Sequence, residues 1–199
     1  MGIREIKMER TRTLIADKAF ELFGRQGFIA TTVEEIAAAA EVGTRTVYRY
    51  YPTKEALVLD PVAKMFDDAL RTLREAAPDA TIPEALQTIL DSALRLVDEQ
   101  PGRVLAIHDL AQEAVSVRAH LVRLVWSVEL ELTGEVARRV GGRQADLIAG
   151  LAVANTTAVF NVAMRNWLDA HGRADMRRIT GSLLELLRSG DVPLPVGLP

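Results

Sequence analysis

The spacing of apolar residues predicts helices along the whole chain. Near the N-terminus, Ile15, Ala19 and Phe23 recur every four residues, the interval that places side chains on one face of a helix. A first helix is therefore expected over residues 9–26, with Gly27 at its end. No segment alternates apolar and polar residues as a half-buried strand would. The pattern predicts an all-α fold.

A second, short helix is marked by a start signal. Thr32 can cap its N-terminus, and Glu35 follows three residues later, which is the spacing of a capping box. The apolar residues of this helix end before Glu41, where a turn is expected. Gly43 can then turn the chain or cap the next helix.

A third helix is expected over residues 44–51. At about 100° per residue, Val47 and Tyr51 fall on one side of this helix. Arg45 and Arg49 fall nearly opposite. Two short helices joined by a tight turn, the second presenting basic residues, have the design of a helix-turn-helix, whose second helix enters the DNA major groove.

Prolines and glycines divide the rest of the chain. Pro52 ends the third helix, Thr53 is expected to cap a fourth at Lys54, and Pro61 is expected to break or kink that helix. Further helices are expected near residues 61–76, 83–99, 103–114, 117–139, 144–170 and 175–189. The breaks between them are expected at Pro78, Pro101-Gly102, Gly141-Gly142 and His171-Gly172, and the proline-containing tail 190–199 is expected to be irregular.

The charge distribution singles out the same region. The chain as a whole carries a net charge of −3, which is not the charge of a general nucleic-acid binder. Residues 42–54, in contrast, contain Arg45, Arg49 and Lys54 and no acidic residue. A local basic window of this kind is what contact with phosphates requires.

Several kinds of chemistry are excluded or disfavoured. The chain has no cysteine, so disulfides, thiolate nucleophiles and cysteine metal sites are ruled out. His108, His120 and His171 are far apart, and no phosphate-binding loop or nucleophile elbow is present. We therefore predict no catalytic residue, no metal and no cofactor. A helical enzyme or small-molecule carrier is an alternative with little support.

The longest uncharged run, Leu147–Met164, bears on location. It is shorter than the span of about 20 residues that crosses a bilayer, and it contains Asn155, Thr156, Thr157 and Asn161. A buried core helix is therefore expected rather than a membrane span. The N-terminus also lacks the apolar segment of a signal peptide, and a cytoplasmic protein is expected.

The residue types of the helix-turn-helix fit DNA contact. Arg45 can donate to guanine edges or to phosphate, and short threonine side chains allow close approach in the groove. Tyrosine hydroxyls and Lys54 can donate to phosphates, as can the backbone N–H groups that begin the second and fourth helices. Taken singly, each residue could equally be a solvated or capping side chain. The prediction depends on their combined spacing.

The segment Thr31–Leu57 resembles the DNA-binding signature of the TetR family of transcriptional regulators. The matching features are Thr31-Thr32, Ile36-Ala37, Glu41-Val42, Thr46-Val47-Tyr48 and Lys54-Glu55-Ala56-Leu57, preceded by Ala19–Phe23 and Gly27-Phe28. The resemblance implies phosphate contacts for Thr32, Thr46, Tyr48, Tyr50 and Lys54, and base contacts for Thr44 and Arg45. The predicted DNA surface is Thr32, Val33, Thr44, Arg45, Thr46, Tyr48, Arg49, Tyr50 and Lys54.

Two residues depart from the family pattern. Glu41 stands where the turn usually has glycine, so no strained backbone is expected there. Gly43 stands where serine often caps the recognition helix, and glycine caps only a few tenths of a kcal/mol worse, roughly. Neither departure changes the assignment.

The resemblance also implies a second domain after the DNA-binding domain, which is expected over residues 1–57. Residues 58–199 would form a helical domain that binds a ligand and pairs with a second copy through the last two helices. Candidate ligand contacts are Phe66, His108, Gln112, Trp126 and Asn155. Candidate dimer contacts are Ala152, Phe160, Leu183 and Leu187. Ordinary packing within one subunit is the alternative for both sets.

Together these features predict a homodimeric repressor in the cytoplasm. Two recognition helices related by a two-fold axis would read an inverted-repeat operator in double-stranded DNA. An apolar or amphipathic small-molecule effector, of the acyl-CoA kind by resemblance, would release the repressor. An architectural DNA-binding protein without a ligand is the remaining alternative.

Overall fold

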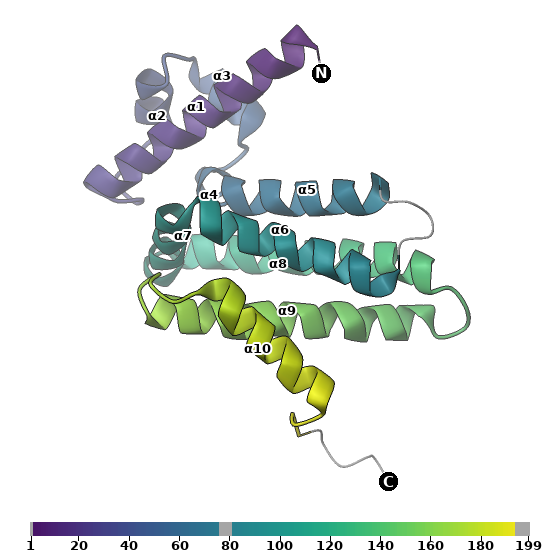
Figure 1. The fold of residues 1–199 in the computed structure, drawn as a ribbon. Helices are drawn as coiled ribbons and strands as arrows, with labels where there is room; N and C mark the ends of the chain where they lie inside the picture. The colour runs from purple at the N-terminus through teal and green to yellow at the C-terminus, as the bar shows by residue number, and fades with distance from the viewer. Residues whose placement is uncertain (1, 76–80, 194–199) are drawn as a thin grey trace. The chain divides into compact units, whose positions relative to one another are not determined.

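The computed structural model describes residues 2–75 and 81–193, and within them the chain is all-helical (Figure 1). This confirms the predicted fold class. The helices are α1 (Ile3–Gln26), α2 (Val33–Ala39), α3 (Thr44–Tyr50), α4 (Lys54–Val58), α5 (Asp60–Glu75), α6 (Ile82–Glu99), α7 (Pro101–Glu113), α8 (Val115–Val140), α9 (Ala145–Asp169) and α10 (Met176–Ser189).

The first helix begins earlier than the apolar pattern predicts. α1 starts at Ile3, six residues before the expected start at residue 9. In these early turns Ile6 and Met8 are exposed rather than buried, so the search for a buried apolar face does not reveal this part of the helix. The predicted end is confirmed, because Gly27 has a φ of 81° and its N–H bonds to the Phe23 carbonyl at 3.0 Å.

The predicted breaks agree with the structure with one exception. α4 ends at Val58 and α5 begins at Asp60, which confirms the break expected at Pro61. Breaks also occur at Gly141-Gly142 and His171-Gly172. Pro101 lies inside the first turn of α7 rather than between helices, since proline is tolerated where its missing N–H has no helical partner. Pro78 lies outside the described residues.

The chain divides into two compact units. The first comprises Met1–Lys64 and Ala106–Trp126, and the second comprises Met65–Leu105 and Ser127–Pro199. Helices α5, α7 and α8 therefore each have residues in both units. The boundaries of these two units differ from the domain boundary expected after residue 57. That domain boundary remains a prediction.

The core of the first unit joins the helix-turn-helix to the α7–α8 corner. Ile15, Ile36 and Val47 share this core with Ile107 and Val117 from α7 and α8. Sequence periodicity does not reveal this contact, because its partners are far apart in the chain. The corner is thus part of the core that supports the helix-turn-helix.

The second unit is built on α6, α9 and α10. Leu90 and Leu94 of α6 pack with Ala163 and Trp167 of α9 and with Met176 of α10. Arg177 of α10 adds ion pairs to Asp98 at 2.7 Å and to Asp91 at 3.6 Å. These contacts hold the last helix against the rest of the unit.

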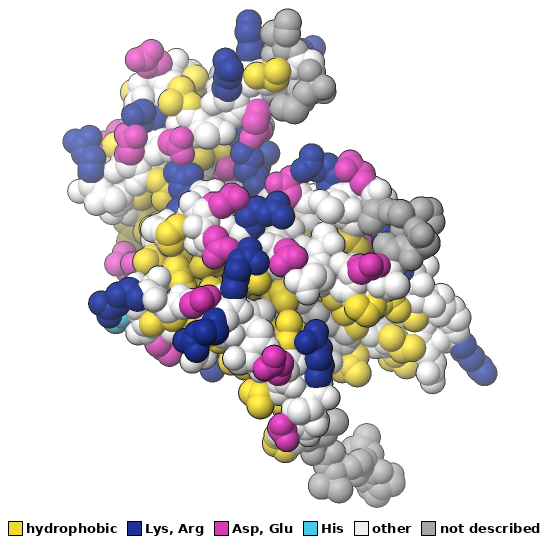
Figure 2. All heavy atoms as spheres, in the orientation of Figure 1, with side chains coloured by type: hydrophobic (Ala, Val, Ile, Leu, Met, Phe, Trp, Pro, Cys, Tyr) yellow, Lys and Arg dark blue, Asp and Glu magenta, His cyan; other side chains and the backbone are white. Residues whose placement is uncertain are grey.

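One face of α9 is not buried. Leu147, Leu151 and Val162 are exposed at helical spacing, Leu151 by 66%. Figure 2 shows exposed hydrophobic side chains on the surface of the second unit. Among the described helices, α9 is also the one that is long and apolar enough to cross a membrane by length and composition. The expectation of a buried core helix is therefore wrong for this face.

Candidate nucleic-acid interface

The predicted capping box of α2 is present. The Glu35 N–H donates to the Thr32 hydroxyl at 3.2 Å, and the Thr32 N–H donates to the Glu35 carboxylate at 2.8 Å. That backbone N–H lowers the pKa of Glu35. The Thr32 hydroxyl also lies 3.2 Å from the same carboxylate. The capping role therefore accounts for Thr32, while its predicted phosphate contact remains untested.

The turn between α2 and α3 uses a left-handed residue. Glu41 has a φ of 55°, whereas the sequence led us to expect no strained backbone there. Its N–H bonds to the Ala38 carbonyl at 3.1 Å, and the Val42 N–H bonds to the Ala37 carbonyl at 2.9 Å. This is a Schellman motif, in which glycine is usual because a side chain disfavours the conformation.

The recognition helix α3 has the predicted orientation. Val47 is 1% exposed and Tyr51 is also buried, while Arg45 and Arg49 lie on the surface. Tyr48 is 51% exposed. Gly43 caps the helix through its backbone carbonyl alone, which accepts from the Thr46 N–H at 2.8 Å. The exposed side of α3 thus presents donors and no carboxylate.

A buried polar contact fixes the end of α3. The Tyr51 hydroxyl donates to the Arg12 carbonyl at 3.0 Å, and the Arg12 guanidinium pairs with Asp60 at 2.8 Å. Asp60 is 5% exposed. Burial, together with the Asp60 carboxylate, raises the pKa of Tyr51, which stays neutral. The cluster ties α1 and the start of α5 to the recognition helix.

Lys54 has a role that sequence reasoning missed. Its ammonium donates to the backbone carbonyls of Phe28 at 2.6 Å and Thr31 at 2.8 Å, with Ile29 at 3.4 Å. It also lies 4.4 Å from the centre of the Phe28 ring. These contacts hold the loop between α1 and α2. The ammonium is therefore directed at the protein, and a phosphate would have to compete for it.

The predicted DNA surface is brought together only in part. Arg45, Tyr48 and Arg49 are exposed on α3, and Arg49 lies 5.1 Å above the Tyr50 ring. Half-buried positions are Val33, Thr44, Thr46, Tyr50 and Lys54. The three exposed residues of α3 are therefore the best placed to reach DNA without any rearrangement.

The candidate ligand contacts do not form a visible site. Trp126 is 72% exposed, and Gln112 and Asn155 are exposed as well. Phe66 and His108 are half-buried. Neither of the two open hollows described in the first unit is lined by any of them. Among the described residues, no group of three His, Asp or Glu side chains could hold a metal ion.

The four candidate dimer contacts differ in exposure. Phe160 and Leu183 are partly buried against the core of the second unit, and Ala152 is half-buried. Leu187 is exposed. Leu147, Leu151 and Val162, which apolar spacing alone does not single out, are exposed along α9.

Comparison with known proteins identifies the helix-turn-helix. The family model of the bacterial regulatory proteins, tetR family, matches residues 15–60. The transcriptional regulator TcmR of Streptomyces glaucescens is 32% identical over 174 residues, which cover 83% of this chain and 76% of that protein.

Solved structures share the whole fold. FadR of Bacillus subtilis, in complex with stearoyl-CoA, matches with a TM-score of 0.58 and 20% identity, over 89% of this chain and 98% of that one. The repressor FadR of Thermus thermophilus, in complex with lauroyl-CoA, has a TM-score of 0.54 and 22% identity, over 94% and 98%. These likenesses concern the fold.

Proposed function

Because the chain belongs to the TetR family of bacterial regulatory proteins, we propose that it is a ligand-released repressor acting as a homodimer on an inverted-repeat operator. The chain is a DNA-binding transcriptional regulator and not an enzyme. The dimer, the operator symmetry, the repression and the ligand are the proposed parts. A cytoplasmic location is proposed because the target is chromosomal DNA.

The exposed side of α3 carries the proposal. Arg45 and Arg49 project from a short helix whose opposite side is held by the buried residues Val47 and Tyr51. A rigidly anchored helix places its side chains reproducibly against base edges. Arg45, near the N-terminus of α3, is assigned to a base edge, and Arg49 with Tyr48 to phosphates.

The exposed face of α9 supports the homodimer. Leu147, Leu151 and Val162 leave an apolar stripe along one helix, and such a stripe is stabilised by burial against another apolar surface. Ala154 and Ala158 lie on the same exposed side and would allow two helices to approach closely. A second copy related by a two-fold axis would cover this face.

An acyl-CoA thioester is the ligand class that we propose to test first. Two solved structures with the same fold hold stearoyl-CoA and lauroyl-CoA. An acyl chain suits a domain whose interior is rich in leucine, valine and alanine.

The α7–α8 corner offers a path from ligand to DNA. Ile107 and Val117 belong to the same core as Ile36 and Val47 of the helix-turn-helix. A ligand that moved this corner would shift the recognition helix with it. Such a ligand must bind the non-repressing state more tightly, since equal affinity for both states moves no equilibrium.

Selection of DNA from a random library tests the proposal directly. We expect an inverted repeat whose half-sites lie about one helical turn, or 10 base pairs, apart. Binding without sequence preference would instead support an architectural protein. Adding lauroyl-CoA or stearoyl-CoA to the complex should then release the selected DNA. If neither releases it, the ligand class is wrong while the operator assignment stands.

A further inference from the structure

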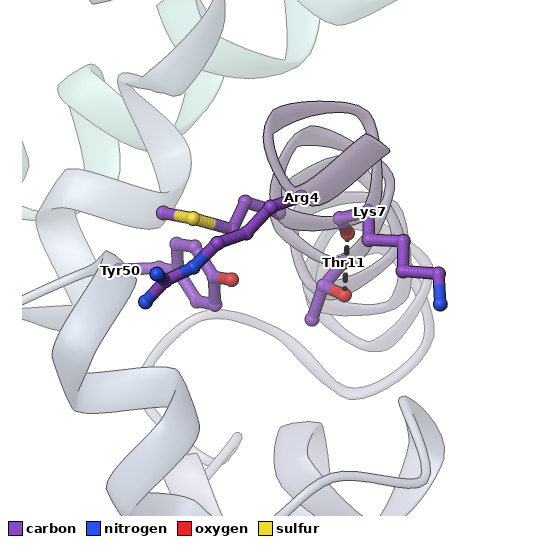
Figure 3. A pocket seen from close by; sticks show the side chains of 5 residues that line it. Arg4, Lys7, Thr11 and Tyr50 are labelled. Atoms are coloured by element: carbon purple, nitrogen blue, oxygen red, sulfur yellow. Dashed lines mark hydrogen bonds between the residues drawn. The ribbon is translucent and has the colours of Figure 1, made fainter. Parts of the chain in front are cut away.

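A basic hollow lies beside the recognition helix, between α1 and α3. It has a volume of about 500 Å³ and is lined by Arg4, Lys7, Met8 and Thr11 of α1 and by Tyr50 of α3. In Figure 3 the Arg4 side chain extends toward Tyr50, and the Lys7 side chain leaves α1 on the other side of Thr11. Two cations therefore border a hollow, and none of its described lining residues is acidic.

The charges of this hollow have no acidic partner among the described side chains. Among the side chains that the structure describes, no carboxylate pairs with Arg4 or Lys7. The nearby Glu9 is held in an ion pair with Lys64, and Arg12 is held by Asp60. Figure 2 shows Lys and Arg side chains beside the N-terminal end of α1.

The polar groups of the hollow offer donors to an anion. Arg4 and Lys7 donate N–H groups. The Tyr50 hydroxyl has no partner among the described side chains, and its ring packs against the core. Thr11 uses its hydroxyl hydrogen on the Lys7 carbonyl at 2.9 Å, so it adds no donor. A site with several donors and no competing carboxylate fits the oxygens of a phosphate.

The neighbouring residues point to DNA rather than to a small anion. Tyr50 joins the hollow to the exposed side of α3, because Arg49 lies 5.1 Å above its ring. The hollow is open, and Met8 adds an exposed apolar surface that suits a sugar. An open basic hollow next to a recognition helix is the position of a backbone phosphate.

We propose that Arg4, Lys7 and Tyr50 form a phosphate clamp that binds the DNA backbone flanking the bases read by α3. Arg4 with Tyr50 holds one phosphate, and Lys7 holds a neighbouring one. The clamp rests on the operator recognition proposed above. It makes α1 part of the DNA-binding surface, which sequence reasoning confined to α2, α3 and α4.

Salt dependence of binding counts the phosphates that are held. We would measure the affinity for the selected duplex of about 30 base pairs between about 50 and 200 mM salt. Each lost phosphate contact should reduce the slope of log K against log salt by about 0.9. Because the proposed dimer carries each contact twice, Arg4→Ala and Lys7→Ala should each reduce the slope by about 1.8, and the double variant should lose about twice as much.

Matched variants separate the clamp from a general loss of charge. Arg10→Ala removes an equal charge from the same helix outside the hollow and should keep the wild-type slope. Lys7→Arg keeps the positive charge and should therefore also keep the wild-type slope. Because Arg4 and Lys7 are exposed, both alanine variants should keep the wild-type thermal midpoint. An unchanged midpoint would exclude unfolding as the cause of a lower slope.

Replacing single phosphates by uncharged methylphosphonates locates the phosphates that the clamp holds. Methylphosphonates placed one at a time in the flanking backbone should weaken the wild type at one or two positions. At those positions Arg4→Ala or Lys7→Ala should lose nothing further. The clamp is overturned if both variants keep the wild-type slope, or if Arg10→Ala lowers it equally. Failure of the wild type to prefer any sequence would instead overturn the operator recognition on which the clamp rests.

Discussion

Glu41 holds a backbone conformation that its side chain disfavours. A left-handed residue with a Cβ costs about 1–2 kcal/mol, and the Schellman hydrogen bonds of Glu41 and Val42 maintain it. Glu41→Gly should therefore stabilise the protein by about 0.5–1 kcal/mol, the strain relief being partly offset by the freedom glycine gains when unfolded. The midpoint of urea denaturation checks this.

A second glutamate provides the control for that substitution. Glu34 is exposed in the first turn of α2, where the backbone is helical. Glu34→Gly should destabilise the protein by roughly 1 kcal/mol. If both substitutions change stability in the same direction, the strain assigned to Glu41 is wrong.

Two roles are open to the Lys54 ammonium, holding the loop between α1 and α2 or binding a DNA phosphate, and a substitution distinguishes them. Its bonds to the Phe28 and Thr31 carbonyls predict that Lys54→Met lowers stability by about 1–3 kcal/mol. Arg49→Met, which removes an exposed cation from each subunit, should leave stability unchanged and lower the slope of log K against log salt by about 1.8 for the proposed dimer. If Lys54→Met has the thermal midpoint of the wild type and only lowers the slope of log K against log salt, the Lys54 ammonium binds a DNA phosphate instead.

These residues show where sequence reasoning stops. The positions of Val47, Arg45 and Arg49 on α3 follow from helical geometry, and the structure agrees. The partners of Lys54 lie 23 and 26 residues away in the chain, so no local pattern reveals them. At Glu41 the side chain predicts an unstrained backbone, but the tight turn after α2 imposes the left-handed conformation.

At the scale of single helices, local caps explain the starting points. Thr32, Thr53, Thr81 and Asp175 each accept from a backbone N–H in the first turn of the helix they cap. Such signals involve residues within three positions of each other, which makes them readable in a sequence. Packing of the α7–α8 corner against the helix-turn-helix involves distant residues and could not be predicted.

The capping box of α2 makes a pH prediction. Glu35 has a lowered pKa when folded, so its contribution is present above the unfolded value of about 4.3 and is lost as pH falls through the folded value. Thermal midpoints measured from pH 7 downward should show Glu35→Gln less stable than the wild type at neutral pH. The two midpoints should converge in acid, and a constant difference would refute the coupling.

For the whole molecule, the exposed face of α9 predicts the oligomeric state. Leu151→Glu places a charge on that face and should convert a dimer to a monomer in sedimentation velocity. Operator affinity should fall by roughly 10²-fold or more, because each half-site would be bound separately. Ile29→Glu alters an even more exposed apolar residue in the first unit and should leave the dimer intact. A Leu151→Glu protein that remains dimeric would assign this face to another role.

The dimer and the ligand site are where the sequence is least informative. The resemblance implies Phe160 and Leu183 as dimer contacts, and in the structure both are partly buried within the second unit. Leu147 and Leu151 are just as apolar and are exposed. Periodicity finds the apolar positions of a helix, but it does not tell which of two apolar faces points inward when the helix packs on both sides.

The central claim is that α3 reads bases through Arg45. Its most direct test is the affinity of the wild type and of Arg45→Ala for the selected operator and for each single base-pair variant of one half-site. We expect Arg45→Ala to cost about 1–3 kcal/mol on the selected operator and to abolish the preference at one position only. An equal loss on every sequence, with all preferences retained, would contradict base reading and make Arg45 a phosphate contact.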